Sequence, residues 1–156
     1  MIVVDASVVI DLLLGVGSPA GDAVAGHLRD GEELGAPHLV DAEVGQGIRR
    51  FVLHGDLTDT EAESMVADFL DVSIKRYRHT GLLPAAFDFR SNVTVHDGLY
   101  LALAETLDCP LLTRDVALAN VSDCRAQVEV LAPQPLSERR VVSGNPPAVA
   151  RSMPRS

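Results

Sequence analysis

Four acidic residues lie beside the ends of predicted strands or on predicted helices: Asp5, Glu43, Asp97 and Asp115. Asp5 and Asp115 each follow a short apolar run that is typical of a buried strand. Asp97 lies in the first turn of a predicted helix, and Glu43 lies on another helix at the border of its apolar face. Carboxylates brought close together repel one another unless a cation neutralises them. Because Mg²⁺ and Mn²⁺ prefer oxygen ligands, these residue types could together bind a divalent metal ion.

Each acid has a simpler structural interpretation when it is taken alone. Asp5 suits the N-cap of the helix that follows it. Asp97 fits a capping box with Thr94, and Asp115 could cap a short helix predicted at residues 115–120. Helix caps need no common location, whereas a metal site requires the side chains to converge. They would converge if the strands before Asp5 and Asp115 are parallel neighbours, because ligand sites of parallel sheets lie beyond the carboxyl ends of the strands.

The predicted elements alternate between strands and helices. This alternation predicts an α/β fold, a three-layer α/β/α sandwich with a mainly parallel central sheet. The predicted strands are residues 2–4, 34–37, 72–77, 110–113 and 128–133. The predicted helices are residues 6–14, 20–30, 38–53, 58–70, 82–90, 95–107 and 115–120.

Composition and charge limit the class of protein. The chain has 156 residues, 47% hydrophobic and 22% charged, and residues 1–132 are predicted to form one domain. Residues 133–156 are rich in proline and serine and carry four arginines against one glutamate, which predicts a flexible tail. The formal net charge of −9 argues against charge-driven coating of nucleic acid. Cys109 and Cys124 lack metal-type spacing and are predicted to be reduced. The N-terminus lacks a basic leader and no run reaches membrane-span length, which favours the cytoplasm.

The chain resembles PIN domains of the VapC toxin type over about residues 1–132. The resemblance is carried by "MIVVDASVVIDLLL", by "VDAEV" with Glu43, and by "VHDGLYLALAETLDCPLLTRD". It implies a PIN-like fold and an endoribonuclease that depends on Mg²⁺ or Mn²⁺. In such an enzyme a metal-activated water hydrolyses an RNA phosphodiester bond. It also implies that the chain is the toxin of a toxin–antitoxin pair, with RNA as substrate, a cognate antitoxin protein as partner and a homodimer as the assembly.

The resemblance gives the catalytic and metal-binding roles to the four acids. The first three would be the main ligands, and Asp115 would complete the pocket directly or through water. Ser7 and Thr113 match small hydroxyl positions that would orient a carboxylate or a water, although local capping explains them equally well. Many relatives have tyrosine before the third acid and alanine after it, where this chain has His96 and Gly98. Some carry a further acid where this chain has Ala117, which leaves a second metal ion open.

The basic residues near these positions have two interpretations. Arg114 and the run 75–79 could contact the RNA backbone, or they could be solvated strand ends. On the helix 58–70, Met65, Phe69 and Leu70 fit either a partner interface or the core.

Other functions were weighed against a nuclease. Haloacid-dehalogenase phosphatases and receiver domains fit poorly, because both need a suitably placed lysine and the only lysine is Lys75. The alternative that stays open is a non-catalytic PIN-like module that binds RNA or protein and retains the acids for folding or for weak metal binding only.

Overall fold

The computed structural model describes residues 1–15 and 18–132, and the tail predicted at residues 133–156 lies outside this part of the chain. The described residues form one sheet in which every paired strand is parallel, in the order β3-β2-β1-β4-β5. The strands are β1 (Ile2–Val4), β2 (Leu34–Pro37), β3 (Ile74–Tyr77), β4 (Leu111–Thr113) and β5 (Val128–Val130). The central strand is thus the first one in the sequence.

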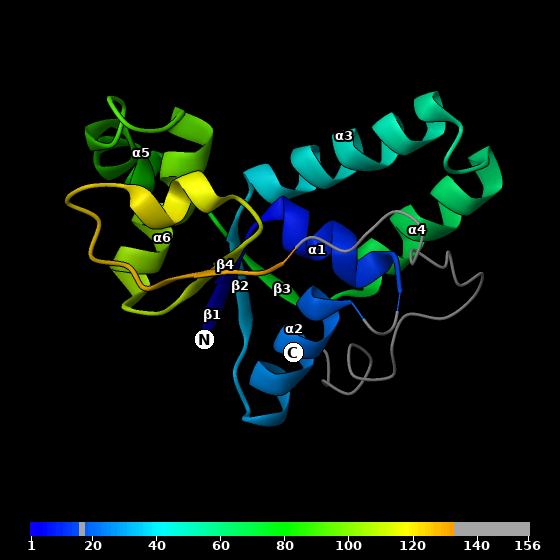
Figure 1. Ribbon diagram of the computed structural model, residues 1–156, viewed down its shortest axis with the longest axis horizontal. Coiled ribbons are helices and arrows are strands. Elements are labelled where there is room, and N and C mark those ends of the chain that lie inside the picture. Colours follow the sequence, from blue (N-terminus) through cyan, green and yellow to red (C-terminus); the bar gives the residue numbers. More distant parts are fainter. Residues whose placement is uncertain (16–17, 133–156) are drawn as a thin grey trace.

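Helices cover both faces of this sheet. Figure 1 shows α5 and α6 on one side, and α1, α3 and α4 on the other, with α2 packed against α1. The helices are α1 (Ala6–Leu13), α2 (Pro19–Arg29), α3 (Leu39–His54), α4 (Asp59–Asp71), α5 (His79–Asp88) and α6 (Val95–Leu107), with a 3₁₀ helix η1 at Val116–Asn120. The predicted α/β sandwich with a parallel sheet is therefore confirmed.

The centre of the sheet is deeply buried. Every residue of β1 is at most 1% exposed, and Leu111 and Leu112 of β4 are fully buried. Strands buried on both faces read as continuous apolar runs, which is the pattern that these residues show. Burying each such side chain contributes roughly 1.5–3 kcal/mol before the entropy cost of folding. The two central strands therefore form a rigid base for the residues that follow them.

Several predicted details differ from the structure. The strands expected at residues 72–77 and 128–133 are shorter, Ile74–Tyr77 and Val128–Val130. The helix expected at residues 82–90 is α5, which begins three residues earlier and contains Pro84 in its interior. A proline inside a helix removes one backbone hydrogen bond, so the sequence pattern favoured a start near Pro84. The helix expected at residues 115–120 is the tighter 3₁₀ type. On α4, Met65 and Phe69 are core residues, whereas Leu70 is 70% exposed.

Helix starts mostly follow the expected capping chemistry. Thr58 and Glu61 form a complete capping box at α4, and Ser18 accepts from the backbone of Gly21 at α2. The first residue of α3 is different, because the Leu39 N–H donates to His79 Nε2 at 2.7 Å. This acceptor comes from the start of α5, so it joins two helices that lie on different faces of the sheet.

Replacing His79 with Ala is expected to lower the free energy of unfolding by about 1 kcal/mol. The Leu39 N–H would lose its acceptor, and losses of this size are typical of a removed helix N-cap. Urea unfolding of both proteins measures the difference. A variant as stable as the unchanged protein would show that water replaces the imidazole at no cost.

One further observation concerns membranes. Among the described residues, no helix is long and apolar enough to cross a bilayer.

Candidate active site

Parallel pairing brings the first and last of the four acids to one edge of the sheet. Val3 and Val4 of β1 are aligned with Leu111 and Leu112 of β4. The residues that follow these strands leave the sheet at the same, carboxyl-terminal edge. Strand β2 ends at this edge too and leads directly into α3, which carries Glu43.

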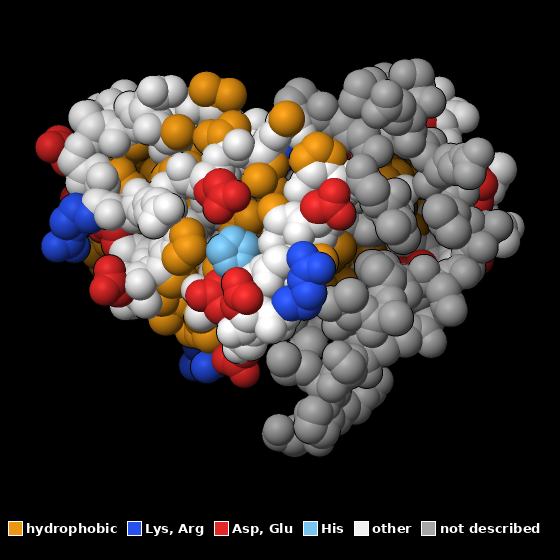
Figure 2. Space-filling model, turned by 60° about the horizontal axis from the view of Figure 1, so that its bottom comes forward, with side chains coloured by type: hydrophobic (Ala, Val, Ile, Leu, Met, Phe, Trp, Pro, Cys, Tyr) orange, Lys and Arg blue, Asp and Glu red, His pale blue; other side chains and the backbone are white. Residues whose placement is uncertain are grey.

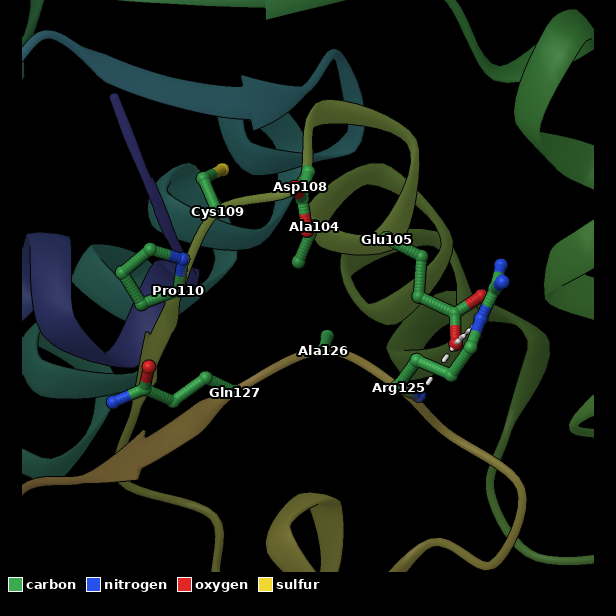
Figure 3. A pocket seen from close by; sticks show the side chains of 8 residues that line it. All are labelled: Ala104, Glu105, Asp108, Cys109, Pro110, Arg125, Ala126 and Gln127. Carbon is green, nitrogen blue, oxygen red and sulfur yellow. Dashed lines mark hydrogen bonds and ion pairs between the residues drawn. The ribbon is translucent and has the colours of Figure 1, made fainter.

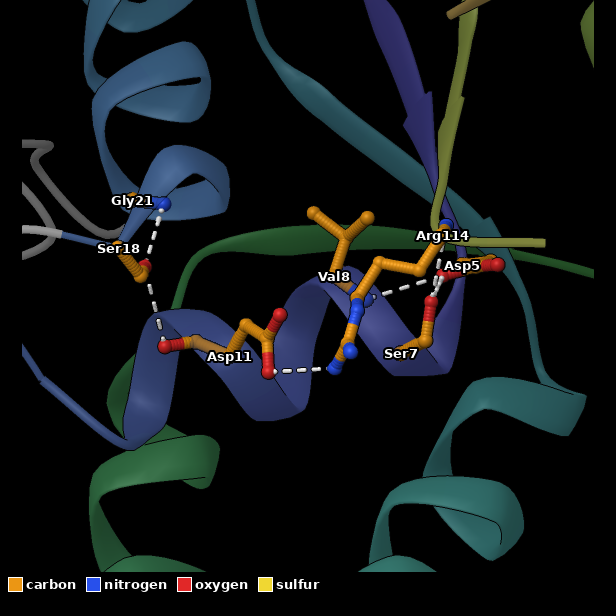
Figure 4. Close-up of polar contacts among 7 residues, drawn as sticks. All are labelled: Asp5, Ser7, Val8, Asp11, Ser18, Gly21 and Arg114. Atoms are coloured by element: carbon orange, nitrogen blue, oxygen red, sulfur yellow. Dashed lines mark hydrogen bonds and ion pairs between the residues drawn. The ribbon is translucent and has the colours of Figure 1, made fainter. Parts of the chain in front are cut away.

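Asp5 is held by three hydrogen bonds at this edge. Ser7 Oγ donates to Oδ1 at 2.6 Å, and the backbone N–H of Val8 donates to the same oxygen at 3.0 Å. The hydroxyl of the fully buried Thr113 donates to Oδ2. Asp5 is only 8% exposed, and this burial raises the pKa of its carboxyl above the ordinary value. The side chain therefore has a fixed orientation, part of which is visible in Figure 4.

Hydrogen bonds through the Thr113 hydroxyl connect Asp115 to Asp5. The backbone N–H of Asp115 donates to Thr113 Oγ1 at 2.9 Å, and the same hydroxyl donates to Asp5. The Asp115 side chain is exposed and accepts from the Ala117 N–H at 2.8 Å, which caps η1. Thr113 thus fixes the carboxylate of Asp5 and the backbone of Asp115.

Glu43 lies across the edge, between α3 and α6. Tyr100 donates its hydroxyl to Glu43 Oε2 at 2.7 Å. Partial burial raises the pKa of Glu43; the charges of Asp97 and Asp5 raise it further, while His96 acts in the opposite direction. These influences indicate that Glu43 lies within electrostatic range of two other acids of the set. The structure thus groups side chains from the ends of β1, α3 and α6.

Asp97 occupies the first turn of α6. Thr94 Oγ1 accepts from the Asp97 N–H at 3.2 Å and donates to Asp97 Oδ2 at 2.6 Å. The side chain therefore bonds the Thr94 hydroxyl rather than its backbone, a variant of the expected capping box. The next residue, Gly98, packs tightly against the backbone of Ala86 on α5. Helix packing therefore limits where Asp97 can lie.

The capping interpretation thus applies to these residues, and the metal site remains a prediction. Asp5, Thr94 beside Asp97, and Asp115 all cap helices, and Glu43 is bound by Tyr100. Within residues 1–15 and 18–132, no three His, Cys, Asp or Glu side chains already converge closely enough to hold a metal ion. The four acids offer only carboxylate oxygens, and this donor set fits Mg²⁺ or Mn²⁺ and not a thiolate-seeking metal.

The comparisons with other proteins agree with this architecture. A family comparison matches residues 2–123 to the PIN domain. The chain belongs to the PIN domain family. It is 41% identical over 132 residues to "Ribonuclease VapC12" of Mycobacterium tuberculosis (strain CDC 1551 / Oshkosh), covering 85% of this chain and 100% of that protein. It is 38% identical over 130 residues to "Ribonuclease VapC1" of the same strain, covering 83% and 96%.

A solved structure gives independent support for the fold. PAE2754 from Pyrobaculum aerophilum is similar to this PIN domain with a TM-score of 0.55 at 20% sequence identity, over 81% of this chain and 87% of that chain. At this level of identity the similarity concerns the fold alone.

The sequence did not single out two contributors to the site of this PIN domain. Tyr100 lies on the leucine-rich helix α6, and a buried tyrosine hydroxyl requires a polar partner, which here is Glu43. Asp11 is 1% exposed in the apolar helix α1 and accepts from Arg114 Nη1 at 2.9 Å. A lone acid among apolar residues was the signal that could have found it.

In the basic run 75–79, several side chains contact other residues of the same chain. Arg76 Nη2 lies 2.9 Å from Asp41 Oδ1, and Lys75 Nζ lies 5.4 Å from the centre of the Tyr77 ring. Arg78 is exposed at the start of α5, at the same sheet edge as the acids. On the face drawn in Figure 2, the described lysine and arginine side chains are few and stand apart. This face therefore offers no continuous basic area in the described part of the chain.

A hollow in the described part of the chain lies away from the four acids. It measures about 490 Å³ and is lined by the end of α6 and by the segments that precede β4 and β5, as Figure 3 shows. Because strands begin here, this is the edge of the sheet opposite to Asp5. Glu105 closes one side and accepts from the Arg125 N–H at 2.6 Å.

The raised pKa of Glu43 predicts a pH dependence for the metal-free protein. A carboxyl whose pKa is higher in the folded state than in the unfolded state stabilises the fold when it is protonated. Its contribution to stability is complete below the unfolded pKa, and it is lost as pH rises through the folded pKa. Glu43→Gln removes this titration. In EDTA, we therefore compare the melting temperatures of Glu43→Gln and of the unchanged protein from pH 5 to pH 8. We expect the variant's melting temperature to rise relative to that of the unchanged protein as pH increases. A constant difference would contradict the raised pKa.

Proposed function

We propose that this PIN domain is an endoribonuclease that depends on Mg²⁺ or Mn²⁺, and that it is the toxin of a toxin–antitoxin pair. The proposal is supported by the hydrogen bonds that join Asp5 to β4 and Glu43 to α6, the helix that carries Asp97, at the carboxyl edge of one sheet. Family membership and relatives that are named ribonucleases support the reaction class. RNA is therefore the proposed substrate.

Asp5, Glu43 and Asp97 would hold the ion, with Asp115 contributing directly or through water. A bound Mg²⁺ or Mn²⁺ lowers the pKa of water and stabilises negative charge on a phosphate. Neighbouring side chains of the protein orient the carboxylates that would bind the ion. Ser7 and Thr113 fix both oxygens of Asp5, and Tyr100 fixes one oxygen of Glu43. Such partners commonly improve metal affinity, because a ligand that is already oriented loses less entropy on binding.

The proposed role of the acids requires them to be ionised. Burial raises the pKa of both Asp5 and Glu43, so protons compete with the metal at acidic pH. Nucleophilic attack comes from water, and the carboxylates form no covalent bond with RNA. We accordingly propose that cleavage is lost as pH falls, and that it is lost at a higher pH than an ordinary carboxylate would predict.

The proposed partners are a cognate antitoxin and a second copy of the chain, and the similarity to VapC ribonucleases supports the first of them. A cognate antitoxin would bind this chain and block the acidic edge, and two copies of the chain would form a homodimer in the cytoplasm. Growth arrest on expression, relieved by co-expression of the protein encoded beside it, would support the toxin role. The mass of the purified chain in solution tests the homodimer.

Cleavage of mixed RNA by the purified chain tests the enzyme. We expect cleavage with Mn²⁺ or Mg²⁺ that stops when EDTA is added and resumes when excess metal is restored. RNA binding without cleavage under all these conditions would instead favour the non-catalytic binding module. The capping roles of Asp5 and Asp115 would then be the reason why those acids are present.

A further inference from the structure

A partly buried ion pair joins the end of β4 to α1, close to Asp5. Asp11 is on α1, one turn beyond Ser7, and its carboxylate is almost fully buried. Arg114 Nη1 donates to Asp11 Oδ1 at 2.9 Å, and the Arg114 side chain is 21% exposed. Figure 4 shows the guanidinium reaching back along α1 from the end of β4. Arg114 is therefore folded onto the protein and not extended towards solvent.

Two successive residues, Thr113 and Arg114, fasten the end of β4 to the start of α1, and Asp115 is bonded to the first of them. Thr113 bonds the Asp5 carboxylate through its hydroxyl. The Arg114 N–H donates to Ser7 Oγ at 3.2 Å, and this hydroxyl donates in turn to Asp5 Oδ1. Asp115 is held by Thr113 Oγ1. Both oxygens of Asp5 thus receive hydroxyl donors whose positions depend on how closely this segment lies against α1.

The Arg114–Asp11 ion pair has the geometry to set how closely the end of β4 lies against α1. Ser7 and Asp11 are four residues apart and so lie on one face of α1, where Arg114 contacts the first through its backbone and the second through its guanidinium. These two contacts fix the position and the rotation of the Arg114 backbone. A guanidinium suits this role, because its planar, always charged group is the one preferred for buried ion pairs.

We propose that Arg114 is a positioning residue, and that its ion pair with Asp11 orients the Asp5 carboxylate and Asp115 for metal binding. The inference rests on the proposed function, in which these acids hold the ion. It is an alternative to the expectation that Arg114 contacts the RNA backbone, because one end of the guanidinium is already bonded to Asp11.

The double variant Asp11→Asn/Arg114→Gln tests the proposal. Removing both charges leaves no lone buried charge, so the double variant is more tolerable to the fold than either single change. Titration of the metal-free protein with Mn²⁺ in a calorimeter should show an affinity about 10–100-fold weaker than that of the unchanged protein. Thermal unfolding verifies that the variant is folded. If it is not, Arg114→Lys retains the charge, and we expect it to bind Mn²⁺ with intermediate affinity.

RNA cleavage kinetics separate positioning from substrate binding. Positioning predicts a lower kcat with an unchanged KM for RNA and an unchanged dependence of KM on salt. A phosphate contact by Arg114 predicts the reverse, a higher KM whose salt slope falls by about one. Since Asp11 and Arg114 act as a unit, the two single variants and the double variant should lose similar activity.

A second ion pair supplies the matched control. Glu105 and Arg125 pair at the opposite edge of the sheet, so Glu105→Gln/Arg125→Gln should bind Mn²⁺ and cleave RNA as the unchanged protein does. Unchanged Mn²⁺ affinity in Asp11→Asn/Arg114→Gln, or in a folded Arg114→Leu variant, would overturn the proposal. If the unchanged protein binds Mn²⁺ but does not cleave RNA, the proposed function fails, while the difference in Mn²⁺ affinity still tests the positioning role.

Discussion

Asp97→Asn is expected to leave the chain folded while lowering RNA cleavage by more than about 100-fold. A loss of this size exceeds the 10–100-fold effect typical of residues that only support a metal ligand. Asparagine keeps the shape of the side chain, and its amide oxygen can still accept from Thr94 Oγ1. The change therefore removes a charge and little else. Initial cleavage rates with Mn²⁺ measure the loss, and thermal unfolding measures the fold.

Glu61→Gln is the matched control for this prediction. Glu61 occupies the same position relative to Thr58 as Asp97 does relative to Thr94, three residues after a threonine N-cap, but it lies on α4. We expect Glu61→Gln to cleave RNA normally. If Asp97→Asn also cleaves normally, Asp97 is only a capping residue and the assignment of the site is wrong.

A second charge effect should accompany the loss of Asp97. The negative charge of Asp97 helps to raise the pKa of Glu43, so Asp97→Asn should move that pKa back towards its ordinary value. Melting temperatures in EDTA across pH 5–8, compared with those of Asp97→Asn/Glu43→Gln, report this shift.

Gly98→Ala is expected to lower the free energy of unfolding by about 1–3 kcal/mol, the range for an overpacked core. A Cβ at this position would lie 2.6 Å from the carbonyl oxygen of Ala86 and 3.3 Å from the Ala86 Cα. These are backbone atoms of α5, so no side-chain rotation relieves the contact. The gain in helix propensity, up to about 1 kcal/mol, offsets only part of this cost. Urea unfolding measures the net change.

Gly45→Ala provides the comparison for this second prediction. Gly45 is exposed on α3, and a Cβ there would meet no atom within 4 Å. We expect alanine at this position to stabilise the chain by about 0.5–1 kcal/mol, because helical glycine costs backbone entropy. Equal stabilities for Gly98→Ala and Gly45→Ala would mean that α5 and α6 can separate freely.

The close contact at Gly98 gives a physical reason for glycine after the third acid. The sequence alone offered no reason for this residue. In the structure α5 lies against α6 at this residue, directly beside Asp97. A shift of α5 that made room for a methyl group would move the first turn of α6, so we expect Gly98→Ala to lower cleavage as well as stability.

Local patterns were sufficient to predict most of the fold. The apolar runs at β1 and β4, and the capping residues Thr58 and Thr94, mark element ends without knowledge of the tertiary structure. Strand ends then placed Asp5 and Asp115 at edges of the sheet. That β1 and β4 are neighbours is a long-range property, and it could be stated only as a condition for convergence.

The parts of the site that the sequence did not predict depend on contacts between distant elements. Tyr100 lies 57 positions from Glu43, and Arg114 lies 103 positions from Asp11. An arginine after a strand could be solvated, could bind RNA or could form an ion pair with an acid. The sequence does not show that α1 places Asp11 beside Arg114. The same applies to His79, whose role as an acceptor for α3 depends on how β2 and β3 pair.

The most direct measurement is a crystal structure of the chain soaked in Mn²⁺, with the ion located by its anomalous scattering. The account predicts a peak at the carboxyl edge of the sheet, within coordination distance of Asp5 and Asp97 and absent from Asp97→Asn crystals. Ions bound only elsewhere, with these carboxylates still bonded only to Ser7, Val8, Thr94 and Thr113, would contradict it.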